Sequence, residues 1–201
     1  MTAGSKEHID ELSPEFLLTA YCNGYFPMAD SATGEIHWYS PDPRAIIALD
    51  GLIISRSLHQ VLRKNTYTIA VDTAFTDVMR MCAARDETWI SDRIIEAYER
   101  LFKLGFAHSV EAWQGGELAG GLYGVAIGGA FFGESMFHTR RDASKVALVG
   151  LVDRLTTNGF SLLDIQFTTP HLVSLGAVEI PKEEYLKRLE EALTKHCSFG
   201  V

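Results

Sequence analysis

The chain has 201 residues, of which 47% are hydrophobic and 22% charged, a balance typical of a globular protein. Its formal net charge of −8 argues against an indiscriminate nucleic-acid binder, because the domains of such proteins are normally basic. Three cysteines without close spacing exclude a disulfide framework and a CxxC zinc site, and a polar N-terminus with no run long enough for a bilayer leads us to expect a cytoplasmic protein.

The first sixty residues predict a small N-terminal unit rich in turns. Ser13 and Pro14 fit the N-cap and first position of a helix that ends at Gly24. Residues 24–44 are rich in turn formers and aromatic side chains, so we expect a loop with at most short strands. A strand over 46–49 and a basic helix over 55–63 follow. We therefore expect a small N-terminal α/β domain over 1–60 and a main domain over 61–201.

The main domain predicts a mixed sheet with flanking helices. A strand over 67–72 precedes helices over 74–84 and 91–104, and three strands then form a meander over 108–137 with a first turn at Gly115-Gly116. A helix over 142–158 crosses to a strand over 161–167, which we expect to pair in parallel with 131–137. A strand over 177–180 and a helix over 182–195 complete the pattern. This order resembles the acyltransferase superfamily of acetyl-CoA-dependent N-acetyltransferases, and the predicted fold class is α+β.

Three polar side chains fall on strands of the predicted sheet where apolar residues are usual. Alternation along 161–167 puts Asp164 and Gln166 on one face. Since a strand that follows a crossover helix is usually central and buried, a carboxylate there is costly unless it is paired or used. Glu134 ends the run AFFGE on the neighbouring strand, so we expect it close to the other two. The spacing alone leaves two interpretations open. The three side chains form a catalytic group, or they have a structural role, either as a satisfied buried network or with Asp164 in water on an edge strand.

The turn before the 142–158 helix bears on the acyl donor. N-acetyltransferases that use CoA cradle its pyrophosphate at this place with a glycine-rich turn. Residues 138–144 contain no glycine and place Asp142 at the helix start, where its charge would repel phosphate. CoA is therefore disfavoured. The chain also lacks GxSxG, P-loop and HExxH motifs, and its seven histidines lack ligand spacing, so we expect no metal.

Two features of the sequence favour RNA binding although the net charge of the chain is negative. Residues 51–65 carry only positive formal charge, from Arg56, Arg63 and Lys64. Large rings lie in turn-like sequence at Trp38, Tyr39 and Trp89. Rings in loops can stack on bases. The alternative interpretation, a solvated helix face and rings folded back on the core, is the commoner case for such patterns and stays open here.

A series of motifs covers the chain in order from residue 12 to about 190. They are GYFPM (24–28), W-x-SPDPR (38–44), TWI (88–90), EAY-x-RL (96–101), ELAGGLYGV (117–125), FFGESMF (131–137), ASK-x-AL (143–148), LLD-x-Q (162–166) and SLGAVEIP (174–181). Together they resemble the bacterial leucyl/phenylalanyl-tRNA–protein transferases. The resemblance implies transfer of Leu, Phe and, less well, Met from aminoacyl-tRNA to the α-amine of proteins that begin with Arg or Lys, which marks them for degradation (the N-end rule).

The resemblance also implies roles for individual residues. Asp164 would act as base or amine orienter, Gln166 would link it to the amine, and Glu134 would attract the amine or the cationic residue. The aminoacyl pocket would be formed by Leu122, Phe131, Met136, Leu148, Leu151 and Leu163. Trp89 with either Trp38 or Tyr39 would hold the terminal adenosine. Separately, from the positive charge of residues 51–65, we expect Arg56, Arg63 and Lys64 to meet the tRNA acceptor stem.

No cofactor is implied by this reaction, because the donor is already an activated ester. Two other functions stay open as alternatives. One is a CoA-dependent N-acyltransferase of small molecules, and the other is a non-catalytic module that binds RNA or peptide. The polar trio at Glu134, Asp164 and Gln166 makes the non-catalytic alternative less natural.

Overall fold

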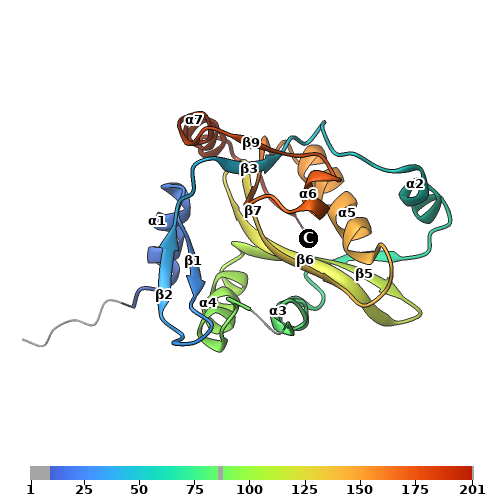
Figure 1. The fold of residues 1–201 in the computed structure, drawn as a ribbon, viewed down its shortest axis with the longest axis horizontal. Helices are drawn as coiled ribbons and strands as arrows, with labels where there is room; N and C mark the ends of the chain where they lie inside the picture. The colour runs from blue at the N-terminus through green and yellow to red at the C-terminus, as the bar shows by residue number, and fades with distance from the viewer. Residues whose placement is uncertain (1–9, 86–87, 201) are drawn as a thin grey trace, which may run out of the picture.

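The computed structural model describes residues 10–85 and 88–200. Within these ranges the strands form two sheets (Figure 1). The smaller is an antiparallel hairpin of β1 (Phe26–Ala29) and β2 (Ile36–Tyr39), preceded by helix α1 (Pro14–Cys22). The Ser13 side chain caps α1 by accepting the backbone N–H of Phe16, and the chain leaves the helix through Gly24 at φ +76°. The predicted first helix and the short strands after it are confirmed.

The larger sheet has seven strands in the order β4-β5-β6-β7-β8-β3-β9. Their bounds are β3 (Arg44–Ile47), β4 (Thr68–Val71), β5 (Ala107–Gln114), β6 (Glu117–Ile127), β7 (Ala130–His138), β8 (Leu162–Gln166) and β9 (Ala177–Ile180). β7 and β8 pair in parallel and the other neighbours are antiparallel, so the predicted mixed sheet is confirmed. Gly115 and Gly116 both have positive φ, as the tight turn between β5 and β6 requires.

Strand β3 lies inside this sheet although it precedes the other six strands in the chain. It pairs antiparallel with β8 on one side and with β9 on the other. It begins two residues earlier than the strand predicted over 46–49. The range 1–60, predicted as a separate small domain, therefore also supplies a strand to the main sheet. Helix α2 (Arg56–Arg63) follows β3 and matches the basic helix predicted over 55–63.

Helices cover both faces of the sheet. One buried apolar cluster joins the sheet to α1, α3 (Phe75–Ala83), α4 (Asp92–Lys103) and α7 (Lys182–Leu193). A second cluster joins it to α5 (Ala143–Thr157), the predicted crossover helix. A short helix that the pattern did not predict, α6 (Pro170–Val173), links β8 to β9. Across 10–85 and 88–200 no helix is long and apolar enough to span a membrane.

β7 and β8 separate at the point where the polar residues lie. Their parallel pairing ends at Phe132 and Asp164. Just beyond this point the register of β7 against β6 shifts, which leaves Glu134 without an opposite residue. Such a β-bulge bends a strand and redirects a side chain. The separation and the bulge together open the sheet and turn Glu134 toward the side chains of α1 and α4.

Candidate active site

A cleft of about 630 Å³ opens where β7 and β8 diverge. Its lining includes Trp89, Glu134, Met136 and Gln166. A smaller cavity of about 80 Å³ adjoins it and shares Glu134 and Met136 with it. Most of the smaller cavity is apolar. The two spaces form a cleft of mixed polar and apolar lining with an apolar side pocket, and Glu134 lines both.

Five of the six residues predicted for an aminoacyl pocket line the smaller cavity. They are Leu122, Met136, Leu148, Leu151 and Leu163. Phe131 is not among the residues that line it: its ring is fully buried and stacks on Phe199 with 5.3 Å between ring centroids. Ile165 and Leu172, which the pattern did not single out, also line the cavity.

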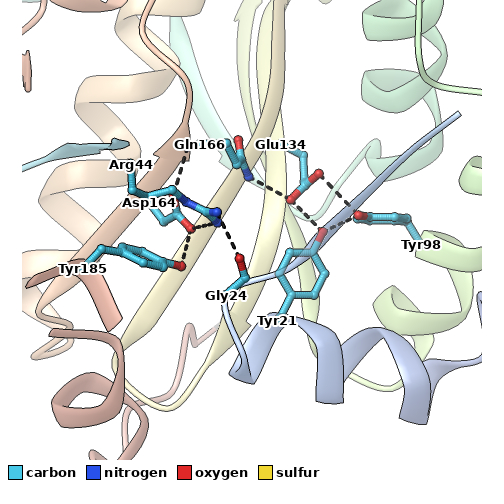
Figure 2. Close-up of polar contacts among 8 residues, drawn as sticks. All are labelled: Tyr21, Gly24, Arg44, Tyr98, Glu134, Asp164, Gln166 and Tyr185. Carbon is cyan, nitrogen blue, oxygen red and sulfur yellow. Dashed lines mark hydrogen bonds and ion pairs between the residues drawn. The ribbon is translucent and has the colours of Figure 1, made fainter. Parts of the chain in front are cut away.

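The three predicted catalytic residues belong to one hydrogen-bonded network, with Gln166 in the middle (Figure 2). The side-chain Nε2 of Gln166 donates to Oε1 of Glu134 at 3.2 Å, and its backbone N–H donates to Oδ1 of Asp164 at 2.9 Å. Gln166 has φ +60°, a conformation that is costly for a residue other than glycine. The carboxylate of Asp164 accepts the N–H of this residue and so helps to stabilise the turn.

Asp164 is completely buried, and its carboxylate accepts hydrogen bonds from side chains and the backbone. Arg44 binds it in bidentate fashion, with Nε–Oδ1 at 2.9 Å and Nη2–Oδ2 at 2.6 Å. The hydroxyl of Tyr185 donates to Oδ2 at 2.7 Å. Arg44 is itself fully buried, donates to the carbonyl of Gly24 at 3.0 Å and lies against the ring of Tyr185. With the backbone N–H of Gln166, four donors occupy this carboxylate, and Asp164 lines neither the cleft nor the cavity.

Glu134 lies in contrasting surroundings at the other end of the network. It is half-buried, and the hydroxyls of Tyr21 and Tyr98 donate to its Oε1 at 2.7 Å and its Oε2 at 3.3 Å. The two hydroxyl oxygens also lie within hydrogen-bond distance of each other, so the three groups form one cluster. Among residues 10–85 and 88–200, Glu134 forms no ion pair. Burial is the main reason that the pKa of Glu134 is raised from 4.5 to about 8, and the two tyrosine bonds act in the opposite direction.

The predicted stacking rings lie at different distances from the cleft. Trp89 lines it directly, and its backbone carbonyl accepts the N–H of Ala29 at 3.1 Å. Tyr39 is 40% exposed and stacks on Phe26, which lines the cleft. Trp38 is half-buried and packs on α1 through Phe16, with 5.2 Å between ring centroids. Trp89 is therefore the one ring of the three that faces the cleft, and Tyr39 adjoins it through Phe26.

The basic residues of α2 lie apart from the cleft. Arg56 and Arg63 border one shallow concavity together with His59, so they lie on the same face of the helix. Lys64 is exposed at the end of the helix. In the described ranges none of these cations pairs with a carboxylate. Figure 1 shows α2 and the β1–β2 hairpin at opposite ends of the long axis of the molecule.

The turn before α5 differs in one respect from expectation. Asp142 precedes the helix, but its carboxylate binds Nζ of Lys145 at 2.9 Å and lies 3.5 Å from Nε of Arg141. These cations offset its charge, so it is the missing glycine rather than Asp142 that disfavours a phosphate at this turn. Within 10–85 and 88–200, no group of three or more His, Cys, Asp and Glu side chains is arranged to hold a metal ion.

Four residues of the network were not predicted from the sequence. They are Tyr21, Arg44, Tyr98 and Tyr185. Arg44 had a signal that could have identified it, because a cation leads the apolar run 45–47, the same anomaly that pointed to Asp164. The three tyrosines had none, since each lies on the apolar side of a helix, where tyrosine is ordinary core.

Comparison with known proteins gives consistent matches along the chain. The family model described as leucyl/phenylalanyl-tRNA protein transferase matches residues 46–190, and the model of the N-terminal domain of the same family matches residues 10–42. The leucyl/phenylalanyl-tRNA–protein transferase of Chlorobaculum parvum is 56% identical over 189 residues, which cover 92% of this chain and 97% of the relative. That of Rubrobacter xylanophilus is 56% identical over 190 residues, covering 94% of this chain and 99% of the relative.

Similarity to solved structures is weaker. An aminoglycoside acetyltransferase from an uncultured soil metagenomic sample matches with a TM-score of 0.44 and 14% identity, over 55% of this chain and 84% of that one. L-PGS from Bacillus licheniformis matches with a TM-score of 0.44 and 14% identity, over 81% of this chain and 55% of that one.

Proposed function

The chain belongs to the leucyl/phenylalanyl-tRNA protein transferase family, and we propose that it transfers Leu, Phe and, less well, Met to proteins that begin with Arg or Lys. As a member it is an aminoacyltransferase that moves an amino acid from aminoacyl-tRNA to a protein. The finer proposal is carried by one observation, the apolar cavity that opens beside Glu134 and Gln166. The product would be marked for degradation.

The cavity supports the choice of donor. Its walls are mostly aliphatic, with Tyr123, Glu134 and Ser135 as the exceptions, so most charged side chains would lose their hydration without gaining a partner. Met136 is flexible and can adjust to side chains of different shape. Val and Ile carry extra bulk next to the ester and should be poor donors. Discrimination by a methyl group is worth only about 1–3 kcal/mol, so some transfer of similar amino acids is expected.

The acceptor would meet the ester in the cleft. An aminoacyl ester needs no further activation, and an α-amine with a pKa of about 7.7–8.0 has a usable neutral fraction near pH 7. Catalysis then depends on positioning and proton transfer. Gln166 and Glu134 line the cleft and can contact the amine. Of the two roles open for Asp164, its complete set of donors favours the orienter, which acts by fixing the backbone of Gln166.

The RNA would be held at two places. Trp89 lines the cleft and would stack on the terminal adenosine, and Tyr39 is favoured over Trp38 as its companion because it adjoins the cleft through Phe26. The cations of α2 and its C-terminal end, which are Arg56, Arg63 and Lys64, would contact phosphates of the acceptor stem. Phosphate contacts carry no sequence information, which suits an enzyme that accepts several tRNAs.

A transfer assay tests this proposal against both alternatives. The protein is incubated with radiolabelled Leu-tRNA and a peptide that begins with Arg, and the expected result is a labelled peptide that is lost after ribonuclease treatment. The matched controls are the same peptide with an acetylated N-terminus and the same reaction with Val-tRNA, both of which should incorporate little label. Transfer from acetyl-CoA without RNA would favour the small-molecule acyltransferase, and RNA binding without transfer would favour the non-catalytic module.

A further inference from the structure

We propose that Glu134, supported by the hydroxyls of Tyr21 and Tyr98, takes the proton from the α-amine of the acceptor, and that Asp164 does not. The inference rests on the proposed function, because it assumes an α-amine that attacks an ester in the cleft. Glu134 would be the catalytic residue of this step. The two tyrosines would be positioning residues, one of them supplied by α1 and the other by α4.

Access to the reacting groups separates the two carboxyl groups. Glu134 lines both the cleft and the apolar cavity, so it lies where the amine and the ester carbon must meet. Asp164 lines neither space and is completely buried. An acceptor amine could reach Asp164 only by displacing Gln166 or Arg44.

The existing partners separate them as well. A proton added to Asp164 would neutralise its carboxylate and weaken the bidentate ion pair with Arg44. The buried guanidinium of Arg44 would then be left without an anionic partner, which is costly. The direct partners of Glu134 are two hydroxyls and one carboxamide, all neutral. A hydroxyl can donate to a carboxylate and reorient to accept from a carboxylic acid. Glu134 can therefore change its protonation state without leaving a buried charge unpaired.

The wider surroundings place the affinity of Glu134 for a proton near that of the amine. The titratable and charged groups that act on Glu134 are Tyr21, Arg44, Tyr98, Tyr123 and Asp164, while Cys82 and Arg85 act on Tyr123. Burial raises its pKa to about 8, the nearby Asp164 adds to this, and the hydrogen bonds from Tyr21 and Tyr98 limit it. An α-amine has a pKa of about 7.7–8.0, so transfer between the two groups is close to balanced.

The proton account closes with one proton released for each peptide bond. The α-ammonium first loses one proton to water, and its nitrogen lone pair then attacks the ester carbonyl carbon. The Glu134 carboxylate takes the second nitrogen-bound proton as the C–N bond forms. The bond from that carbon to the ribose oxygen of the terminal adenosine breaks, and this oxygen takes the proton from Glu134, which becomes a carboxylate again. The third proton stays on the amide.

The test is the pH dependence of single-turnover transfer from Leu-tRNA to saturating peptide that begins with Arg. Glu134→Gln should lower the rate by about 10²–10⁴-fold at pH 7, the usual contribution of general base catalysis. The loss should become larger as the pH rises through about 8, because more of the wild-type Glu134 is then a carboxylate that can act as a base. A residue that only attracts the cationic acceptor would raise KM and leave the rate at saturation little changed.

Two conservative variants sharpen the test. Tyr21→Phe removes a donor that stabilises ionised Glu134, so the pKa of Glu134 rises and the acid limb of the rate profile moves to higher pH. The matched control is Tyr185→Phe, which removes the same kind of bond from Asp164 and should leave the limb in place. Circular dichroism establishes that each variant is folded.

The outcomes divide cleanly. A loss in Glu134→Gln that is equal at every pH, or a limb shifted by Tyr185→Phe and not by Tyr21→Phe, would overturn the inference while the proposed function stands. A wild-type protein that transfers no amino acid from Leu-tRNA would overturn the proposed function and this inference with it.

Discussion

The two carboxyl groups of the network lie on neighbouring strands and are joined by a single residue, yet their surroundings are opposite. Asp164 is fully buried and held by a guanidinium and a phenol, whereas Glu134 is half-buried and held by neutral donors beside open space. A buried ion pair is costly to break, while a carboxyl group among hydroxyls can be protonated at little cost. Asp164 is therefore suited to stabilising the fold, whereas Glu134 is free to change its protonation state beside the cleft.

The largest expected contrast is in stability. Arg44→Met leaves the Asp164 carboxylate buried without its cation and should lower the free energy of unfolding by about 3–5 kcal/mol. Glu134→Gln keeps the shape of the side chain among neutral partners and should not lower the free energy of unfolding at pH 7, because it removes a group that ionises more easily in the unfolded chain than in the folded protein. Urea unfolding at pH 7 measures both. Equal losses in the two variants would contradict the contrast.

A second contrast is the effect of pH on stability. The pKa of Glu134 is raised from 4.5 to about 8 on folding, so between these values the folded protein holds a proton that the unfolded chain has released. Its contribution to stability is therefore fully present below about pH 4.5 and is lost as the pH rises toward 8, by at most about 1.4 kcal/mol for each pH unit. When the free energy of unfolding is plotted against pH, the wild-type curve should therefore fall relative to the Glu134→Gln curve between pH 4.5 and 8. Parallel curves would exclude a raised pKa.

The smallest contrast compares two hydroxyl groups at pH 6. Tyr185→Phe removes a hydrogen bond to a carboxylate and should cost about 1.5–3 kcal/mol. Tyr21→Phe removes a bond to a carboxyl group that is mostly protonated at this pH and should cost about 0.5–1.5 kcal/mol. Thermal unfolding of both variants gives the difference, and a reversed order would show that Glu134 is ionised in the folded protein.

Local sequence patterns were enough to predict most of the fold. Alternation, caps and turn glycines are local signals, and they identified the helices except α6, the β5–β6 turn and the parallel pairing of β7 with β8. The position of β3 in the sheet could not be predicted, because its partners lie more than a hundred residues away and no local pattern records them. The left-handed Gln166 was hidden for a related reason, since that conformation is fixed by a contact with Asp164.

The site was predictable where a residue contradicts its surroundings. Asp164 and Glu134 attracted attention as carboxyl groups on apolar strands. Tyr21 and Tyr98 did not, because their rings satisfy the apolar face of a helix and only their hydroxyls enter the network. Phe131 was wrongly predicted to line the pocket for a similar reason. The sequence shows that it is apolar and on the correct strand, but not that its ring packs into the core behind the pocket.

The insertion of β3 between β8 and β9 affects how the chain can fold during its synthesis. Arg44 and Asp164 are 120 residues apart in the chain, and long-range pairings of this kind slow folding because loop closure must come first. A chain that leaves the ribosome from its N-terminus exposes both edges of β3, and the guanidinium at its start, until β8 and β9 have been made. We therefore expect nascent chains that stop before β8 to depend on chaperones.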